Sequence, residues 1–261
     1  MIYIYQKGIQ EWLHFKRFQE TASILESLSD SPLKILEIGG GDGYIASIFS
    51  KEGHDIFSMD LQPRYPSSFQ VKQMSAEHLI FPKNTFDIIF SSNVLEHINE
   101  LSPVFKEMQR VAKHEAQFIF FLPTPTWRLI SSFWYFFRLI KAFLTKLFYF
   151  ICKRSKTITT DNNVYENQVE LEKVSLYKKI KHIILHPHGA YPSFLHELYY
   201  FSPFRWKRLF INNGFKILSH KRGPLFYSGE SFFKFRFIKY RKLLAKYFFS
   251  SIHIYILKTK K

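Results

Sequence analysis

Short apolar runs alternate with amphipathic stretches over the first half of the chain. The runs are of the buried-strand type and cover residues 33–38, 54–59, 69–73, 86–91 and 115–122. Apolar positions recur at helical spacing in residues 6–28, 44–51 and about 101–111. Strands that alternate with helices predict right-handed crossovers and a mainly parallel sheet with helices on both faces.

The pattern changes after Pro125. Residues 127–151 are aromatic and basic, residues 153–168 are polar and predicted to be a loop, and residues 202–212 predict a helix that stops at Asn213 and Gly214. Two further strands are predicted at 215–220 and 251–257, separated by a basic helix near 232–248. We therefore expect a doubly wound α/β fold with a seven-stranded sheet and a helical, aromatic cap inserted after the fifth strand. The expected units are residues 1–122, 123–200 and 201–261.

A glycine-rich loop lies between the first predicted strand and the helix that follows it. Residues 37–43 read E-I-G-G-G-D-G, and such a sharp turn needs glycine where a Cβ would clash or block a ligand. Asp60 ends the second strand 17 residues after Gly43, where a carboxylate can accept hydrogen bonds from both hydroxyls of a ribose. The dinucleotide spacing G-x-G-x-x-G is not kept, because its last position is Tyr44 or Ala46. Dinucleotide binding is therefore disfavoured.

Four motifs in this order resemble those of the class I S-adenosylmethionine-dependent methyltransferases. The loop matches the family's acidic-x-G-x-G-x-G motif, and Asp60 matches its acidic strand end. S-A-E-H-L-I-F at 75–81 is similar to D-A-E-x-L-P-F, and F-D-I-I-F-S-S-N-V-L-E-H at 86–97 is similar to F-D-x-x-x-S-x-x-L-E-H. The group with the closest likeness includes methyltransferases of the ubiquinone and menaquinone pathways and of cell-surface glycan clusters.

The resemblance implies a Rossmann-like fold, S-adenosylmethionine as the cofactor and methyl transfer as the reaction. The residues that it assigns to the cofactor are Glu37, Gly39, Gly41, Gly43, Asp60, Ser75, Ala76, Glu77 and Asn93. Ser75 stands where the family usually has an aspartate that contacts the adenine amino group. A hydroxyl accepts that hydrogen bond more weakly than a carboxylate.

A general base is needed only if the methyl acceptor is a hydroxyl. His97 is one candidate, because it follows the fourth strand and ligands bind at the carboxyl ends of strands. His188 is the second, in a segment that also contains His186, His196 and Glu197. These residues do not make a convincing metal site, and no metal is expected. Helix packing is the alternative role for His97, and a structural loop is the alternative for the histidine-rich segment.

Charge and aromatic content narrow the class of acceptor. The net charge is +16, yet residues 1–120 hold 11 basic against 15 acidic residues, so the excess lies entirely in the second half. Residues 127–151 predict an amphipathic helix with Leu129, Phe133 and Phe137 on one side; the basic residues opposite are Arg128, Arg138, Lys146 and Lys153. Arg138, Lys141 and Lys146 interrupt the apolar run. These charges disfavour a membrane span and favour a helix that lies on an anionic membrane surface. A helix that covers the sheet core is the alternative.

These observations favour a methyltransferase that acts on a hydrophobic or lipid-linked small molecule or glycan. An RNA methyltransferase is the alternative, since basic and aromatic residues also suit nucleic acid, and a catalytically silent protein of the same fold is a third. The single cysteine, Cys152, and a start without a signal-peptide pattern favour the cytosol, with peripheral contact at the inner face of the membrane.

Overall fold

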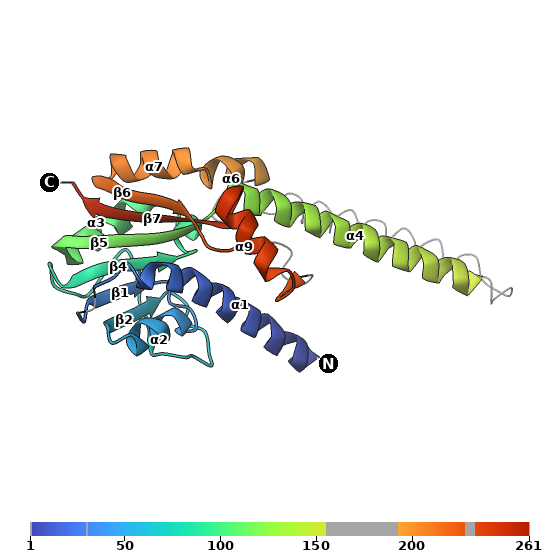
Figure 1. Ribbon diagram of the computed structural model, residues 1–261, viewed down its shortest axis with the longest axis horizontal. Helices are drawn as coiled ribbons and strands as arrows, with labels where there is room; N and C mark the ends of the chain where they lie inside the picture. Colours follow the sequence, from blue (N-terminus) through green and yellow to red (C-terminus); the bar gives the residue numbers. More distant parts are fainter. Residues whose placement is uncertain (1, 30, 155–192, 228–232, 261) are drawn as a thin grey trace.

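The structure is a computed structural model that describes residues 2–29, 31–154, 193–227 and 233–260. In these residues seven strands form one sheet with the order β3-β2-β1-β4-β5-β7-β6 (Figure 1). The strands are β1 (Lys34–Ile38), β2 (Asp55–Asp60), β3 (Val71–Gln73), β4 (Phe86–Ser92), β5 (Ala112–Pro123), β6 (Phe215–Arg222) and β7 (Ile252–Thr259). The first five are parallel, and β7 is antiparallel to β5 and β6. The predicted, mainly parallel seven-stranded sheet is confirmed.

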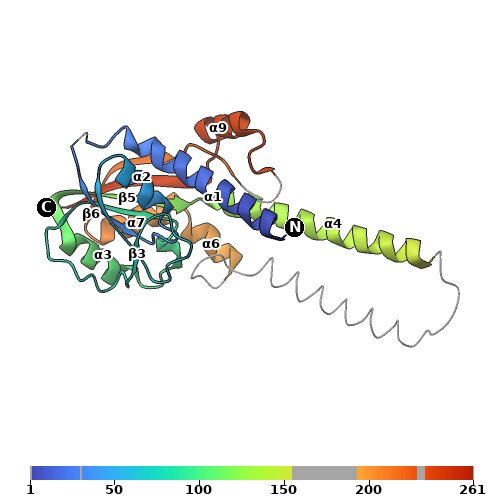
Figure 2. The same cartoon turned by 90° about the horizontal axis from the view of Figure 1, so that it is seen from below.

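Helices cover both faces of this sheet. They are α1 (Ile2–Leu25), α2 (Tyr44–Lys51), α3 (Leu101–Val111), α4 (Pro125–Arg154), α6 (Phe194–Tyr200), α7 (Pro203–Asn212) and α9 (Ile238–Tyr247), with a 3-10 turn at Leu95–His97. Helices α1 and α2 pack on one face through side chains such as Trp12 and Phe49, and α3 and α7 pack on the other through Phe105 and Phe210. Figure 2 shows α1 and α2 on the side of the sheet opposite α3 and α7.

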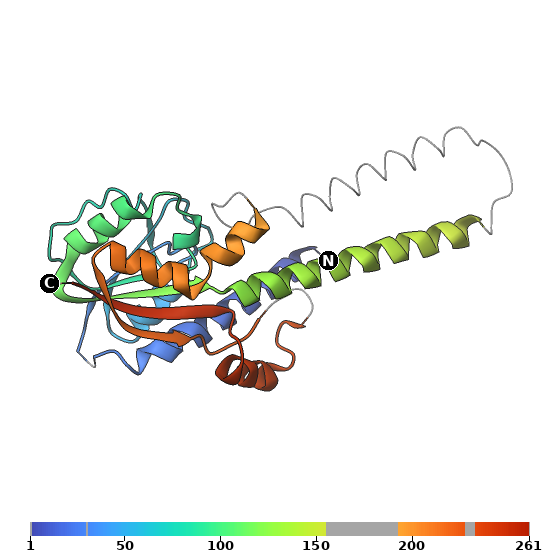
Figure 3. The same cartoon turned by 90° about the horizontal axis from the view of Figure 1, so that it is seen from above.

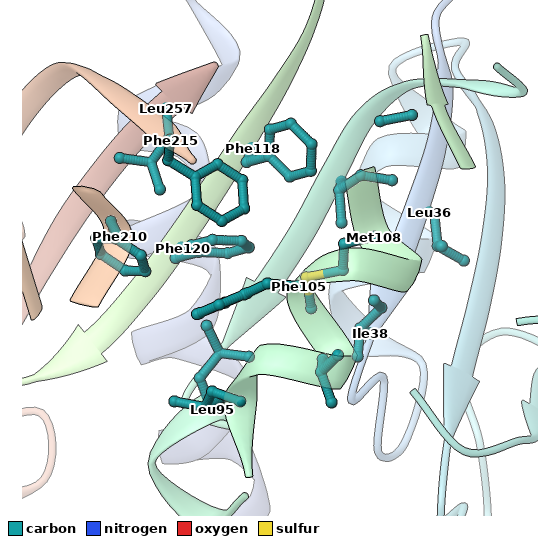
Figure 4. Close-up of a cluster of buried hydrophobic side chains, with 14 of the residues drawn as sticks. Leu36, Ile38, Leu95, Phe105, Met108, Phe118, Phe120, Phe210, Phe215 and Leu257 are labelled. Carbon is teal, nitrogen blue, oxygen red and sulfur yellow. The ribbon is translucent and has the colours of Figure 1, made fainter. Parts of the chain in front are cut away.

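The core explains part of the high phenylalanine content. One cluster packs the rings of Phe105, Phe118, Phe120, Phe210 and Phe215 between the sheet and helices α3 and α7 (Figure 4). The ring centroids of Phe118 and Phe215 are 4.9 Å apart in an edge-to-face arrangement, and those of Phe105 and Phe215 are 5.3 Å apart. Such geometry adds about 0.5–1.5 kcal/mol per pair to the free energy gained by burial. Part of the aromatic excess is therefore structural.

Helix α4 begins directly after β5 and extends away from the sheet (Figures 1 and 3). Around its middle, residues 141–148 are exposed on every side of the helix, so this part does not cover the sheet core. Phe133 and Phe137, from the predicted apolar side, are 63% and 48% exposed. None of the helices in the described part of the chain is long and apolar enough to cross a bilayer.

Arg128 corrects one detail of the predicted amphipathic helix. We expected it on the outward, basic side of residues 127–151, but its side chain is buried at the root of α4. The cause is Glu197 on α6, whose carboxylate accepts a short hydrogen bond from the Arg128 guanidinium. Because its partner is 69 residues away in sequence, the burial of Arg128 could not be predicted from the local pattern of polar and apolar residues.

Candidate functional site

A cavity of about 800 Å³ lies at the carboxyl ends of the strands, beside the boundary between β1 and β4. At this boundary the strand order reverses, which is where open α/β sheets bind ligands. Seven of the residues predicted to act in binding or catalysis line the cavity: Gly39, Asp60, Ser75, Ala76, Glu77, Asn93 and His97. The topology therefore brings together four motifs that are up to about sixty residues apart in sequence.

The glycine loop needs its glycines for two reasons. Gly39 and Gly41 have φ angles of +84° and +58°, a left-handed conformation that residues with a Cβ rarely adopt. A Cβ at Gly39 would also overlap the side chain of Val94, and one at Gly41 would overlap the guanidinium of Arg64. Arg64 lines the cavity and Gly41 does not, so a side chain at Gly41 would displace a residue of the cavity wall.

Glu37, at the end of β1, is buried under the glycine loop and helps to hold it in place. Its carboxylate is 1% exposed, does not line the cavity, and accepts a 2.5 Å hydrogen bond from the Ser58 hydroxyl. Burial raises the pKa of Glu37 to about 7, although the Ser58 hydrogen bond opposes this shift. A Cβ at Gly40 would overlap that hydroxyl, so the buried pair sets how closely the loop packs on β2. Gly43 likewise does not line the cavity and packs against the backbone of Phe69.

Asp60 connects the end of β2 to the glycine loop. One carboxylate oxygen accepts a 2.9 Å hydrogen bond from the Gly41 backbone amide, and the other accepts one of 2.8 Å from Gln62. Each carboxylate oxygen can accept a second hydrogen bond, and the side chain lines the cavity. The geometry leaves Asp60 able to bind a diol such as that of a ribose.

Replacing Asp60 by alanine is expected to weaken donor binding about 10- to 100-fold. The substitution removes charge-assisted hydrogen bonds of about 1.5–3 kcal/mol and frees the Gly41 amide. Titration calorimetry with S-adenosylhomocysteine measures the change. Asp55→Ala is the matched control, because Asp55 is exposed at the amino end of the same strand. Equal affinities for both variants would remove Asp60 from the site.

The end of β4 supplies the opposite wall of the cavity. Asn93 has a φ of +53°, which asparagine tolerates better than most residues, and its backbone amide donates to the Phe121 carbonyl. Residues held in such conformations cluster at functional sites. Ser75 follows β3, and its hydroxyl accepts a hydrogen bond from the Glu77 amide, which closes the turn that carries this part of the wall.

Helix α1 closes the cavity with charged side chains that the sequence analysis did not identify. Lys16 and Glu20 are only 4% and 2% exposed, and both line the cavity. The Tyr227 hydroxyl donates a 2.7 Å hydrogen bond to Glu20, and the Lys16 ammonium lies 4.4 Å from the centroid of the Tyr227 ring. Burial raises the pKa of Glu20, while the Tyr227 hydrogen bond and the Lys16 charge oppose the shift. A signal was present, since Lys16 and Glu20 share the buried helix face with Trp12 and Ile24.

Asp42 ties this helix to the glycine loop. Its carboxylate accepts hydrogen bonds of 2.7 Å from Arg17 and 2.9 Å from the ring of His14. Burial alone would raise the pKa of Asp42, but the Arg17 charge and the His14 hydrogen bond hold it below its ordinary value. Arg17 also lines the cavity. Helix α1 therefore forms part of the cavity wall and also holds the glycine loop in place through Asp42.

His97 lies at the cavity in the 3-10 turn after β4, with its side chain 45% exposed. Partial burial lowers its pKa, and the carboxylate of Glu197 on α6 opposes that effect. Its ring nitrogen is 3.9 Å from a carboxylate oxygen of Glu96. Glu96 is fully buried, and burial raises its pKa to about 8. A mostly neutral imidazole therefore faces the cavity near pH 7.

Only the end of the histidine-rich segment lies in the described part of the chain. His186 and His188 lie outside the described residues. His196 is exposed on α6, where its ring is 2.7 Å from the Ser193 hydroxyl at the start of the helix. Glu197, the next residue, is the one that reaches the interior and pairs with Arg128. Among the described residues, no three His, Cys, Asp or Glu side chains are placed to hold a metal ion.

A glycine loop after β1, a carboxylate at the end of β2 and a left-handed asparagine at the end of β4 together define a nucleotide-type cofactor site in a doubly wound sheet. Residues 36–120 match the family model of a methyltransferase domain. These residues thus form a methyltransferase domain, as predicted, and its motifs resemble those of the class I S-adenosylmethionine-dependent enzymes.

Curated relatives agree with this domain. An uncharacterised methyltransferase of Bacillus subtilis (strain 168) is 29% identical over 98 residues, which are 33% of this chain and 39% of that protein. An uncharacterised methyltransferase of Mycolicibacterium vanbaalenii is 30% identical over 94 residues, 33% of this chain and 37% of that protein. The chain thus spans less than two fifths of the length of either relative.

Solved structures support the fold over the whole chain. The 1,6-didemethyltoxoflavin-N1-methyltransferase of Burkholderia thailandensis, with 1,6-didemethyltoxoflavin and S-adenosylhomocysteine bound, matches with a TM-score of 0.53 and 12% identity over 100% of this chain and 85% of that one. A S-adenosylmethionine-dependent methyltransferase from Aquifex aeolicus matches with a TM-score of 0.50 and 12% identity over 95% and 97% of the two chains. At these identities the likeness concerns the fold alone.

S-adenosylmethionine is the cofactor of this class, and the residues present fit it. The guanidinium of Arg64, which lines the cavity, packs over Gly41, and each carboxylate oxygen of Asp60 can accept a further hydrogen bond from a ribose hydroxyl. The cavity volume lies within the range of about 300–1,000 Å³ typical of small-molecule sites.

Proposed function

We propose that the protein transfers the methyl group of S-adenosylmethionine to a hydrophobic or lipid-linked acceptor at an anionic membrane surface. The observation that carries the methyltransferase part is the convergence of Gly39, Asp60 and Asn93 on one cavity. Bound there, the cofactor supplies an electrophilic methyl group. The protein's part is to align an acceptor with that methyl group and to exclude water.

The apolar part of the cavity lining supports an acceptor that is partly apolar. The wall includes Leu13, Met74, Val94, Ile98, Val104 and Trp127. The polar residues of the wall include the hydrogen-bonded pair of Glu20 and Tyr227, which is buried beside Lys16 beneath α1. This pair can hold a hydroxyl or carbonyl of the acceptor by hydrogen bonds in a site with little water.

His97 is the proposed general base for a hydroxyl acceptor. It lines the same cavity, and its lowered pKa keeps the imidazole neutral near pH 7. His188, which the sequence also singles out, remains a second proposed base. The Arg128–Glu197 pair fixes α6 to the root of α4 on the His97 side of the cavity.

The membrane part of the proposal rests on α4. Its exposed apolar residues include Phe133, Phe137 and Leu144, and Lys141 and Lys146 are exposed on the same projecting helix. A helix of this kind can bury its apolar side among lipid headgroups while its lysines contact anionic phosphates. Trp127, in the first turn of α4, lines the cavity, so an acceptor dissolved in the membrane would have a short path to the site.

A methyl-transfer assay with two crude acceptor pools tests this function. Purified protein is given S-adenosylmethionine with a radioactive methyl group, together with either a membrane lipid extract or total RNA. We expect label in the organic phase with the lipid extract, and none above background on RNA. Asp60→Ala serves as the low-activity control. Label on RNA alone would favour the rival nucleic-acid function, and donor binding without transfer to either pool would favour a silent binding protein.

A further inference from the structure

We infer that the segment 233–248, which contains α9, is a docking surface for an anionic lipid bilayer. The inference deepens the membrane part of the proposed function but rests on a different element from α4. The segment contains six Lys or Arg residues and no Asp or Glu. Its surface is therefore complementary in charge to anionic lipid headgroups.

One side of α9 packs against the rest of the protein. Arg241 and Ala245 are buried, and Ile238 packs against the core cluster beneath α1. The Arg241 guanidinium lies 4.7 Å from the centroid of the Trp12 ring and donates hydrogen bonds to the carbonyls of Phe226 and Lys234. These contacts fix which side of the helix faces solvent, so the exposed side is a defined surface.

The solvent-facing side of α9 combines apolar side chains with lysines. Tyr240, Leu243 and Tyr247 follow at i, i+3 and i+7 and are 67%, 45% and 60% exposed. Lys239, Lys242 and Lys246 are exposed beside this stripe, and Phe237 and Phe248 add exposed rings at the two ends of the helix. Large apolar groups exposed so close together cost solubility unless they meet a partner.

This arrangement fits a bilayer better than RNA. A lipid surface accepts an apolar stripe into its interfacial region while flanking lysines stay at the phosphates. An exposed leucine gains more binding free energy in the interfacial region of a bilayer than against nucleic acid, because bases stack on flat aromatic rings. Figures 1 and 3 show α9 at the same end of the sheet as the root of α4. Through Trp12, α9 also supports α1, which walls the cavity.

Vesicle flotation with the full chain tests the inference. The vesicles contain phosphatidylcholine with or without phosphatidylglycerol. One variant, Lys239→Glu, Lys242→Glu, Lys246→Glu, reverses charge. A second, Tyr240→Ser, Leu243→Ser, Tyr247→Ser, removes the apolar stripe at constant charge. The matched control is Lys72→Glu, Lys83→Glu, Lys106→Glu, which changes three exposed lysines far from α9 in sequence. S-adenosylhomocysteine binding by each variant verifies that it is folded.

We expect wild-type protein to float with phosphatidylglycerol vesicles in a salt-sensitive way, and both α9 variants to lose at least about tenfold in vesicle affinity. The control should float like wild type. The inference would be overturned if the α9 variants floated like wild type, or if the control variant lost as much vesicle affinity as they did. It would also be overturned if wild-type protein bound RNA but did not float with the vesicles. Adding Lys141→Glu, Lys146→Glu separates the two proposals. If only the α4 variant loses vesicle binding, the α9 inference fails and the α4 contact is supported. If only the α9 variants lose vesicle binding, the α9 inference is supported and the α4 contact fails.

Discussion

Gly41→Val is expected to abolish measurable binding of S-adenosylmethionine and S-adenosylhomocysteine, a loss of at least about 100-fold. The isopropyl group would overlap the guanidinium of Arg64 and displace this side chain, which lines the cavity. The φ of +58° would in addition be strained for a β-branched residue. Titration calorimetry on the folded variant, checked by its circular dichroism spectrum, measures the effect.

Substitution of a second glycine, Gly53, distinguishes the effect of backbone strain from a steric effect at the ligand site. Gly53 has a φ of +86°, and a Cβ there would meet nothing within 4 Å. Gly53→Val should therefore lower the free energy of unfolding by about 1–2 kcal/mol, as expected for a left-handed residue, yet bind the donor like wild type. If Gly41→Val bound the donor as tightly as Gly53→Val, the glycine loop would not be the cofactor site.

His97→Ala is expected to lower turnover on the lipid-extract acceptor by at least about tenfold and to leave donor affinity nearly unchanged. General-base catalysis typically contributes about 10²–10⁴-fold, and His97 is the described histidine that lines the cavity. His97→Gln should be as slow as alanine, because an amide fills the site but cannot take the proton. His114→Ala is the control, since His114 is 71% exposed in the part of β5 near its amino end.

The pH dependence gives this prediction a second readout. Burial lowers the pKa of His97, so the neutral, basic form predominates above that lowered value. Wild-type turnover should be on its plateau at pH 7 and should fall only as the pH drops below the ordinary histidine value. Normal turnover in His97→Ala at every pH would show that alignment alone drives the reaction, as for a carbon or amine acceptor.

Periodicity and turn chemistry were sufficient to predict the sheet. Helices α2 and α3 begin and end at the predicted residues, because glycine and polar positions delimit them in the sequence. Strand β5 begins at Ala112, three residues before its predicted start. Ala112 is buried and pairs with Phe86 on β4, whereas residues 113–115 are polar and exposed and precede a shift in the register. Local pattern thus locates elements, and long-range pairing sets their ends.

The cavity residues that lie in sequence motifs were predictable, whereas the charged residues on α1 and Tyr227 were not predicted to line it. Asp60 and Ser75 lie in ordered motifs, and parallel strands bring such motifs to one edge of the sheet. Lys16, Glu20 and Tyr227 reach the same cavity from opposite ends of the chain, and no local motif links them. The burial of charged groups depends on partners that are distant in sequence, as with Arg128 and Glu197.

Titration of the wild-type protein with S-adenosylhomocysteine, with NAD⁺ as the comparison, tests the central assignment most directly. The glycine loop, Asp60 and the cavity predict one site per chain with a Kd on the order of micromolar for S-adenosylhomocysteine, and no measurable heat with NAD⁺. Absence of heat with S-adenosylhomocysteine, or tighter binding of the dinucleotide, would contradict the account.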